Sequence, residues 1–206
     1  MRAVPLDVQP DDELLASRRA RGLDRWDEMW EGELHMVPPP SFDHQRLGAE
    51  LLVVLHGVAS PLGLAVTHET GVFDSDDPDQ SYRVPDLSVT RPEHRKQRGI
   101  EGGAVLLVEI RSPSDESYEK LPFYAAHGVE RVLILEPDTF EADVFVLGAE
   151  GYERLEADEQ GEKALGVGGL AVGVEVDGDD PEQIGLRVRD GAHVTVLWAR
   201  DLYAGR

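Results

Sequence analysis

The sequence predicts an α/β (α+β) fold with a β-rich C-terminal extension. Residues 104–137 contain two apolar runs of strand length on either side of a helix-forming segment, which predicts a strand–helix–strand unit. An amphipathic helix is predicted over residues 42–58, and short apolar runs with glycine-rich turns follow residue 156. We expect one domain over residues 1–206, with a core at about 26–147 and an acidic tail at about 156–206.

The composition excludes several classes of site. The chain has no cysteine, so it has no disulfide framework, no thiolate zinc site and no cysteine nucleophile. No apolar run approaches the length of a membrane span, and the N-terminus lacks the apolar stretch of a signal peptide. We therefore expect a cytoplasmic protein without a membrane partner. The formal charge of −21 argues against a broad, passive surface for nucleic acid.

The first part of the chain is predicted to alternate helices and strands. Residues 11–29 have apolar residues at loose helical spacing after two aspartates, which predicts a helix with arginines on one face. Residues 31–37 predict a short strand that a run of prolines ends. Ser41 is a favourable N-cap for the helix over 42–58. His44 lies in the first turn of that helix, where it either stays on the surface or faces a site.

Two further strands are predicted over residues 64–73 and 82–90. In the second, Leu87 and Val89 alternate with polar residues, so Asp86 points to the face opposite these two apolar side chains. A basic loop over residues 91–99 then precedes the strand–helix–strand unit. Together with the arginines of residues 11–29, this loop holds the only concentrated positive charge.

The strand–helix–strand unit carries an acid on its first strand. Glu109 follows the apolar run from Val105 and stands directly before Ile110. An ionised carboxylate at the end of a buried strand is costly unless a partner pairs with it or a ligand binds it. Residues 115–126 predict a helix that carries Lys120, one of three lysines in the chain, and residues 129–135 predict the second strand.

The C-terminal part is predicted to be rich in β-structure. A hairpin is predicted from residues 142–147 and 152–155, and four more strands are expected at residues 164–167, 170–176, 185–189 and 194–198. Between Glu153 and Glu182 ten acidic residues face only two basic ones, so this segment cannot be a phosphate-binding surface.

Asp86, Glu109 and Lys120 form the constellation that could carry chemistry. Two carboxylates from neighbouring strands can bind Mg²⁺ or Mn²⁺, because these cations prefer oxygen ligands. A nearby lysine can orient a water molecule or stabilise a phosphate in the transition state. These are the parts that a phosphodiester hydrolase needs, although acids near strand ends and lysines on helices also occur for structural reasons alone.

The order of these motifs resembles that of a known family. The segments PD, VEIRSPS, EKLPFYAAHGV and VLILEP, preceded by EGELHMVPPPSFDHQRLGAELL, are similar to the bacterial putative restriction endonuclease family of the PD-(D/E)XK superfamily. The resemblance extends over roughly residues 26–147. It implies a restriction-endonuclease-like fold in which a mixed central β-sheet is flanked by helices.

The resemblance also implies roles for individual residues. Asp86 and Glu109 match the metal-binding acids, with the backbone carbonyl of Ile110 as a further ligand. The usual superfamily lysine would stand at Arg111, and in this family it is replaced by a lysine on the following helix, here Lys120. Catalysis is therefore expected from Asp86, Glu109 and Lys120. Apart from the resemblance, His44 is a candidate for substrate positioning, and Arg111 is expected either to position the substrate by binding a phosphate or to pair with a carboxylate.

The implied activity is a Mg²⁺- or Mn²⁺-dependent endonuclease that hydrolyses DNA phosphodiester bonds, with nucleic acid as its partner and a homodimer by analogy. A second hypothesis is a non-catalytic interaction or regulatory module of the same fold, which the charge of −21 favours. A third hypothesis is that the acidic tail carries a surface that mimics DNA or acts as an inhibitor.

Overall fold

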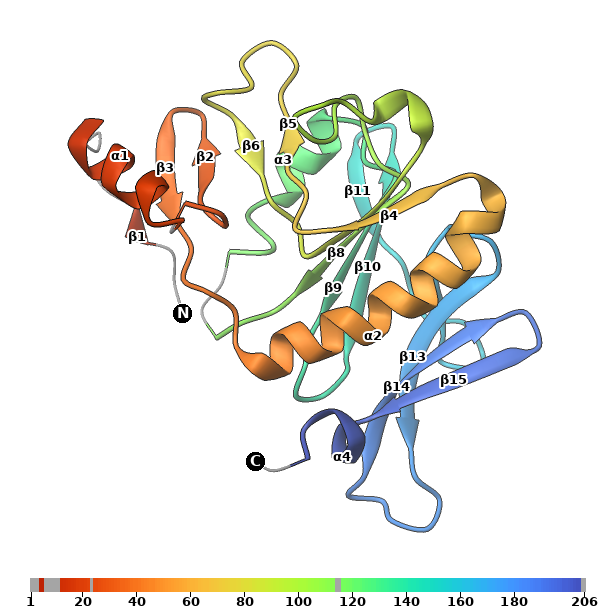
Figure 1. Ribbon diagram of the computed structural model, residues 1–206. Helices are drawn as coiled ribbons and strands as arrows, with labels where there is room; N and C mark the ends of the chain where they lie inside the picture. The colour runs from red at the N-terminus through yellow and green to blue at the C-terminus, as the bar shows by residue number, and fades with distance from the viewer. Residues whose placement is uncertain (1–3, 6–11, 23, 114–115, 205–206) are drawn as a thin grey trace.

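The computed structural model describes residues 4–5, 12–22, 24–113 and 116–204. Within these residues the strands form three sheets, and the predicted α+β architecture is confirmed. Figure 1 shows the long helix α2 lying across one face of the central mixed sheet, with the C-terminal sheet beside its lower edge. Within the same residues, no helix has the length and apolar character needed to cross a membrane.

The central sheet has six strands in the order β11-β10-β9-β8-β7-β4. Strands β8 and β9 are parallel, and the other neighbours are antiparallel. The parallel pair is the predicted strand–helix–strand unit, because such a pair needs a crossover connection. The strands are β4 (Ala65–His68), β7 (Leu87–Thr90), β8 (Leu106–Ile110), β9 (Arg131–Leu135), β10 (Ala142–Gly148) and β11 (Gly151–Arg154).

The two faces of the central sheet bury different helices. On one face Leu106, Val108 and Ile110 belong to the same core cluster as the buried leucines of α2 (Phe42–Ala59). On the other face Leu107 packs with Phe123 and Tyr124 of α3 (Leu121–Ala126). Because side chains alternate along a strand, Glu109 lies on the α3 face.

Helix α2 begins where the sequence predicts. Ser41 caps it by accepting a hydrogen bond from the His44 backbone N–H at 3.2 Å. The 3₁₀ turn Ser60–Leu62 follows its end, and a second such turn, Pro92–His94, lies in the basic loop. The capped first turn holds His44 at the end of the sheet where β8 finishes.

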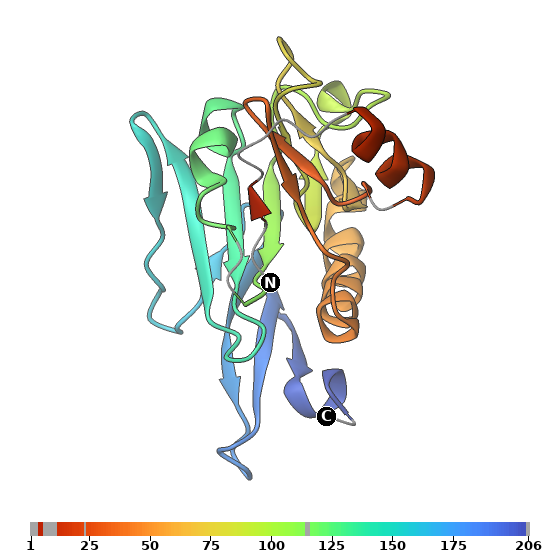
Figure 2. The same ribbon diagram turned by 90° about the vertical axis from the view of Figure 1, so that its left-hand side faces the viewer.

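A smaller sheet in the order β1-β3-β2-β6-β5 stands next to the central one. Figure 2 shows α1 beside this sheet, on the right of the view. The strands are β1 (Val4–Pro5), β2 (Glu28–Trp30), β3 (Glu33–Met36), β5 (Val72–Phe73) and β6 (Tyr82–Arg83), and the helix is α1 (Asp12–Ala20).

The predicted helix over residues 11–29 is wrong beyond Ala20. Gly22 has φ +63°, a left-handed conformation that ends helices, and residues 28–30 pair with β3 and β6 instead. The predicted strands 64–73 and 82–90 are each divided between two sheets. Glu69, with φ +48°, interrupts the first, and Pro85 stands at the break in the second.

The helix predicted over residues 115–126 is shorter in the structure. It begins at Leu121 with Pro122 in its first turn, and Lys120 is its N-terminal cap residue. Residues 114 and 115 lie outside the described part of the chain.

The predicted β-rich extension is confirmed as a third, antiparallel sheet in the order β12-β13-β14-β15. Its apolar side chains, among them Leu170, Val172 and Leu186, belong to the core cluster that α2 also enters. The elements are β12 (Lys163–Ala164), β13 (Leu170–Val176), β14 (Ile184–Asp190), β15 (His193–Trp198) and α4 (Ala199–Leu202).

Candidate active site

Strands β7 and β8 bring Asp86 and Glu109 together. Leu87 pairs with Val108 in the antiparallel ladder, and continuing this register by one residue sets Asp86 opposite Glu109. The Asp86 carboxylate is fixed in place, because its Oδ2 accepts a hydrogen bond from the Ile110 backbone N–H at 2.6 Å. The two predicted metal ligands therefore share one end of the sheet.

Glu109 is almost completely buried, with 4% of its surface exposed. Its Oε1 accepts a hydrogen bond from the Tyr124 hydroxyl at 2.6 Å. The Lys120 ammonium lies 3.1 Å from Oε2 and 3.3 Å from Oε1. Helix α3 thus supplies both partners of this carboxylate, Lys120 at its cap and Tyr124 one turn later.

A second buried carboxylate, Glu28 on β2, holds Lys120 from the other side. Its Oε1 lies 2.8 Å from Lys120 Nζ and also accepts the Val84 backbone N–H at 2.8 Å. Its Oε2 accepts the Trp30 indole N–H at 2.8 Å. Sequence reasoning missed Glu28, because it fell inside the helix that was predicted over residues 11–29.

One ammonium between two buried carboxylates changes the ionisation of the group. Burial raises the pKa of Glu109 to about 8, although the charge of Lys120 opposes this, and the nearby Asp86 and Glu28 raise it further. For Lys120, burial acts to lower the pKa, but the charges of Glu109 and Glu28 outweigh it and the pKa rises. The cluster has an excess of negative charge, which a proton or a cation would relieve.

The contacts of His44 show how the predicted ligand oxygens are oriented. Its Nε2 lies 2.9 Å from the Ile110 carbonyl oxygen and 3.4 Å from Asp86 Oδ1. Burial acts to lower the pKa of His44, but the hydrogen bond and charge of Asp86 outweigh it, so the pKa is raised. Two of the three expected ligand oxygens thus converge on one positively polarised N–H group. The donor set fits a hard cation.

The side chains supply few metal ligands. Among the described residues, no group of three histidine, aspartate or glutamate side chains is arranged to hold a metal ion. A site of two carboxylates and one carbonyl oxygen therefore stays a prediction, and in such a site Mg²⁺ would keep several waters.

Arg111 lies away from this cluster. Its Nη1 is 3.0 Å from Glu136 Oε2, and its guanidinium lies 5.5 Å from the centre of the Tyr118 ring. It lines a neighbouring hollow together with Tyr118 and Lys163. The structure therefore brings Asp86, Glu109, Lys120 and His44 together and leaves Arg111 outside.

A cavity of about 330 Å³ opens onto the cluster. Its lining includes the polar groups of Glu28, Asp86, Glu109, Lys120 and His44, and two further carboxylates, Glu69 and Glu116. Apolar residues also line it, namely Trp26, Val37, the prolines 38–40 and Val84. A substrate in this cavity would meet both charged groups and aromatic and aliphatic side chains.

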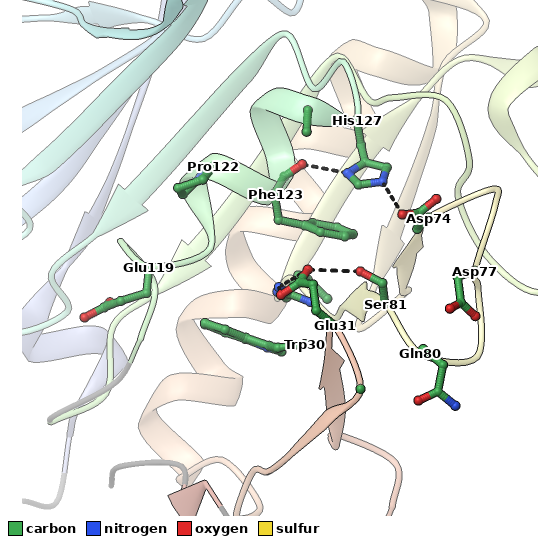
Figure 3. A pocket seen from close by; sticks show the side chains of 13 residues that line it. Trp30, Glu31, Asp74, Asp77, Gln80, Ser81, Glu119, Pro122, Phe123 and His127 are labelled. Atoms are coloured by element: carbon green, nitrogen blue, oxygen red, sulfur yellow. Dashed lines mark hydrogen bonds and ion pairs between the residues drawn. The ribbon is translucent and has the colours of Figure 1, made fainter.

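A larger hollow of about 640 Å³, shown in Figure 3, lies elsewhere and holds none of the predicted site residues. The Arg83 guanidinium is stacked between the rings of Trp30 and Phe123, at 4.2 and 4.3 Å. His127 turns toward Asp74, and Glu31 toward Ser81. Because these polar groups pair with one another, we assign no chemistry to this hollow.

The basic residues noted in the sequence are mostly neutralised by acidic neighbours. Five of these arginines form ion pairs: Arg18 with Asp27, Arg19 with Asp24, Arg25 with Glu69, Arg91 with Glu130 and Arg98 with Asp79. The positive field expected over these two segments is correspondingly weak.

Comparisons with known proteins support a nuclease fold. The model of the Uma2 family, described as a putative restriction endonuclease, matches residues 13–178. The crystal structure of a putative nuclease belonging to DUF820 from Anabaena variabilis ATCC 29413 matches with a TM-score of 0.52 and 20% identity, over 63% of this chain and 75% of that chain. A comparison with curated proteins found no match. The structural likeness shows a shared fold.

Proposed function

The chain belongs to the putative restriction endonuclease family, and from this premise we propose that it is a metal-dependent endonuclease that hydrolyses DNA phosphodiester bonds. One observation carries the proposal. At the end of β8, Asp86 and Glu109 stand opposite each other on neighbouring strands, beside the ammonium of Lys120. A buried group of this kind has little structural purpose that a well-packed apolar cluster would not serve equally well.

Asp86, Glu109 and the carbonyl oxygen of Ile110 would hold Mg²⁺ or Mn²⁺. Such a cation, when bound, lowers the pKa of a water molecule and offsets the negative charge of a phosphate. Asp86 is kept in place by the Ile110 N–H, and Glu109 by Tyr124. These bonds hold the two carboxylates in fixed positions before a substrate arrives.

Lys120 has the geometry of a residue that orients a reactant. An ammonium has three N–H donors, and Glu28 and Glu109 accept from it on two sides. Lys120 also lines the cavity, so a remaining donor can reach a phosphate oxygen or an attacking water. His44 is the second donor at this end of the site and can bind a substrate oxygen once it leaves the Ile110 carbonyl.

The test uses circular DNA in two forms, supercoiled plasmid and single-stranded phage-type circles, with Mn²⁺ or Mg²⁺ and with EDTA. We expect cleavage with the metals and none in EDTA. Asp86→Asn and Glu109→Gln should each lower the rate by at least about 100-fold, in the range found when one essential electrostatic group is removed. Glu159→Gln, an exposed acid of the tail, should keep full activity. No cleavage of either DNA by the wild type, at any salt concentration tried, would sink the proposal.

The paired arginines and the net charge of −21 favour a second candidate, a non-catalytic module of the same fold. The hypothesis of a non-catalytic module predicts that no DNA is cleaved and that Glu109→Gln behaves like the wild type in every binding assay. A homodimer, which cutting both strands of a duplex would use, stays a prediction that light scattering can test.

A further inference from the structure

The candidate catalytic groups lie below the surface. Exposure is 4% for Glu109, and the side chains of Lys120, His44 and Asp86 are exposed by 12%, 10% and 18%. A double helix is a wide, stiff cylinder with its phosphates on the outside, so it cannot enter a narrow cavity. A single strand can, because its backbone bends and its bases can be turned outward.

The size of the cavity fits one nucleotide. A volume of about 330 Å³ lies at the lower end of the range for small-molecule sites, which enclose most of their ligand. The lining of the cavity also includes apolar residues, Trp26, Val37 and the prolines 38–40, that phosphodiester hydrolysis itself does not require. A nucleobase is the part of a nucleic acid that would contact them.

Trp26 is the aromatic residue among these apolar side chains. Its indole nitrogen Nε1 is buried, and no described residue accepts a hydrogen bond from it. Because this nitrogen is not accessible, a base in the cavity would contact the ring of Trp26 by stacking. The guanidinium of Arg25 lies 5.4 Å from the centre of the Trp26 ring and is paired with Glu69 at 3.0 Å, so it is not counted as a phosphate contact.

The surface also lacks what a duplex would need. Specific duplex complexes bury large, strongly positive areas of protein. Here Arg18 and Arg19 of α1, and Arg91 and Arg98 of the basic loop, are paired with acids, and the chain carries a formal charge of −21. A single strand whose base is enclosed gains a stacking contribution on an aromatic ring in addition to the electrostatic one, and a paired duplex base cannot make this contact.

We propose that this site takes single-stranded DNA, with one unpaired nucleotide in the cavity. Its base lies against Trp26 and the proline run, and its phosphate faces Asp86, Glu109 and Lys120. The cleavage part of this inference rests on the proposed nuclease function, whereas the preference for a single strand in binding does not.

The binding experiment uses one labelled oligonucleotide, alone and annealed to its complement, with the wild-type chain in Ca²⁺, which takes oxygen ligands as Mg²⁺ does, at fixed ionic strength. Fluorescence anisotropy should give an affinity for the single strand at least about tenfold higher than for the duplex. Trp26→Ala should weaken single-strand binding by about tenfold, and Trp26→Phe, which keeps a ring, by less. Trp198→Ala, a tryptophan on β15 that does not line the cavity, should bind like the wild type. Thermal melts establish that each variant is folded. If Trp26→Ala is unfolded, Trp26→Phe takes its place in the test.

The cleavage experiment adds Mn²⁺ and a third substrate, a duplex with an unpaired stretch at its centre. We expect cuts in the single strand and within the unpaired stretch, with little cutting of the full duplex. Equal or better binding or cutting of the full duplex overturns the inference, as does a failure to bind any of the three. Selective single-strand binding without cleavage of any DNA supports the inference while contradicting the nuclease function.

Discussion

The Lys120 ammonium lies 2.8 Å from Oε1 of Glu28, so the lysine of the candidate site is anchored to β2 in the smaller sheet as well as to Glu109 on β8. Glu28 also accepts a hydrogen bond from Val84, two residues before Asp86. One carboxylate therefore links the smaller sheet to the segment that leads into β7 and to the start of α3. Its position ties the two sheets together at the point where the proposed chemistry occurs.

This arrangement predicts an energetic coupling between Glu28 and Lys120. Lys120→Met should lower the free energy of unfolding by about 3–5 kcal/mol, because it leaves two buried carboxylates without a cation. Adding Glu28→Gln to that variant should restore more than about 1 kcal/mol, since one of the unpaired charges is removed. Urea melts of the four chains at neutral pH give the coupling.

An exposed lysine provides the control for this cycle. Lys96→Met should change the stability by less than about 0.5 kcal/mol, as surface substitutions usually do. If Lys120→Met and Glu28→Gln add within about 0.5 kcal/mol, the two side chains do not interact in solution as they do in the structure.

Because of Glu109, the stability of the metal-free protein should depend on pH. Its pKa is raised to about 8 in the folded state, whereas an unfolded glutamate titrates near 4.5. Between these values the folded state holds a proton that the unfolded state has released, so this group's contribution to stability is complete at low pH and is lost as the pH rises to about 8. Glu109→Gln, which cannot titrate, should remove that part of the slope.

The measurement is a series of urea melts in EDTA from pH 5 to pH 8.5. For each pH unit of increase within this range, the unfolding free energy of the wild type should fall by up to about 1.4 kcal/mol relative to that of Glu109→Gln. A difference that does not change with pH would mean that Glu109 is ionised throughout and that Lys120 alone balances its charge.

Glu162, next to the third sheet, should make the stability change with pH in the direction opposite to that expected for Glu109. It is buried, with Oε2 2.7 Å from Arg189 Nε and Oε1 2.8 Å from Arg187 Nε. Its pKa is lowered, first by the hydrogen bond from Arg189 and then by the charges of both arginines, against the effect of burial. Its contribution to stability is therefore present above the unfolded pKa near 4.5 and is lost as the pH falls through the lowered value.

At neutral pH Glu162→Gln should lower the unfolding free energy by roughly 1.5–3 kcal/mol, the range for hydrogen bonds to a charged group. Thermal melts should show this gap closing as the pH is lowered below the unfolded pKa near 4.5. Glu159→Gln, exposed and three residues earlier, should show no gap at any pH. If the difference in unfolding free energy between the wild type and Glu162→Gln stays the same in acid, the lost stability comes from packing and not from charge.

The parts of the site that sequence reasoning found are those with a local signal. The alternation through Leu87 and Val89 placed Asp86, and the apolar run around Glu109 marked a buried strand. Lys120 drew notice because lysine is rare in this chain. Ser41, as a cap residue, located α2 and with it His44.

The parts that were missed depend on contacts between distant segments. Glu28 lies in a strand of three residues, too short to show an alternating pattern, and its pairing partners stand in β3 and β6. Tyr124 was expected only as a helix residue, and its hydroxyl matters because the α3 face of β8 carries Glu109. The ion pairs that neutralise the arginines join segments that no local pattern connects.

The last prediction tests the metal site without a substrate. Asp86 and Glu109 stand opposite each other, and their mutual repulsion in the metal-free state adds to the effect of burial on Glu109. A cation that binds only the folded state adds RT ln(1 + [L]/Kd), about 2.7 kcal/mol at a hundredfold excess over Kd. The wild type should therefore melt at a higher temperature in millimolar Mn²⁺ or Mg²⁺ than in EDTA, and this gain should be larger at pH 8 than at pH 6, because a protonated Glu109 cannot bind a cation.

Two variants separate a specific site from general screening of the −21 charge. Glu109→Gln removes a ligand and a repelling charge together, so it should melt at or above the wild-type temperature in EDTA at neutral pH and lose most of the gain in metal. Glu159→Gln changes the net charge by the same amount but lies in the exposed part of the tail, so it should keep the gain. If both variants respond to Mn²⁺ as the wild type does, the cation only screens surface charge, and Asp86 and Glu109 are not a metal site.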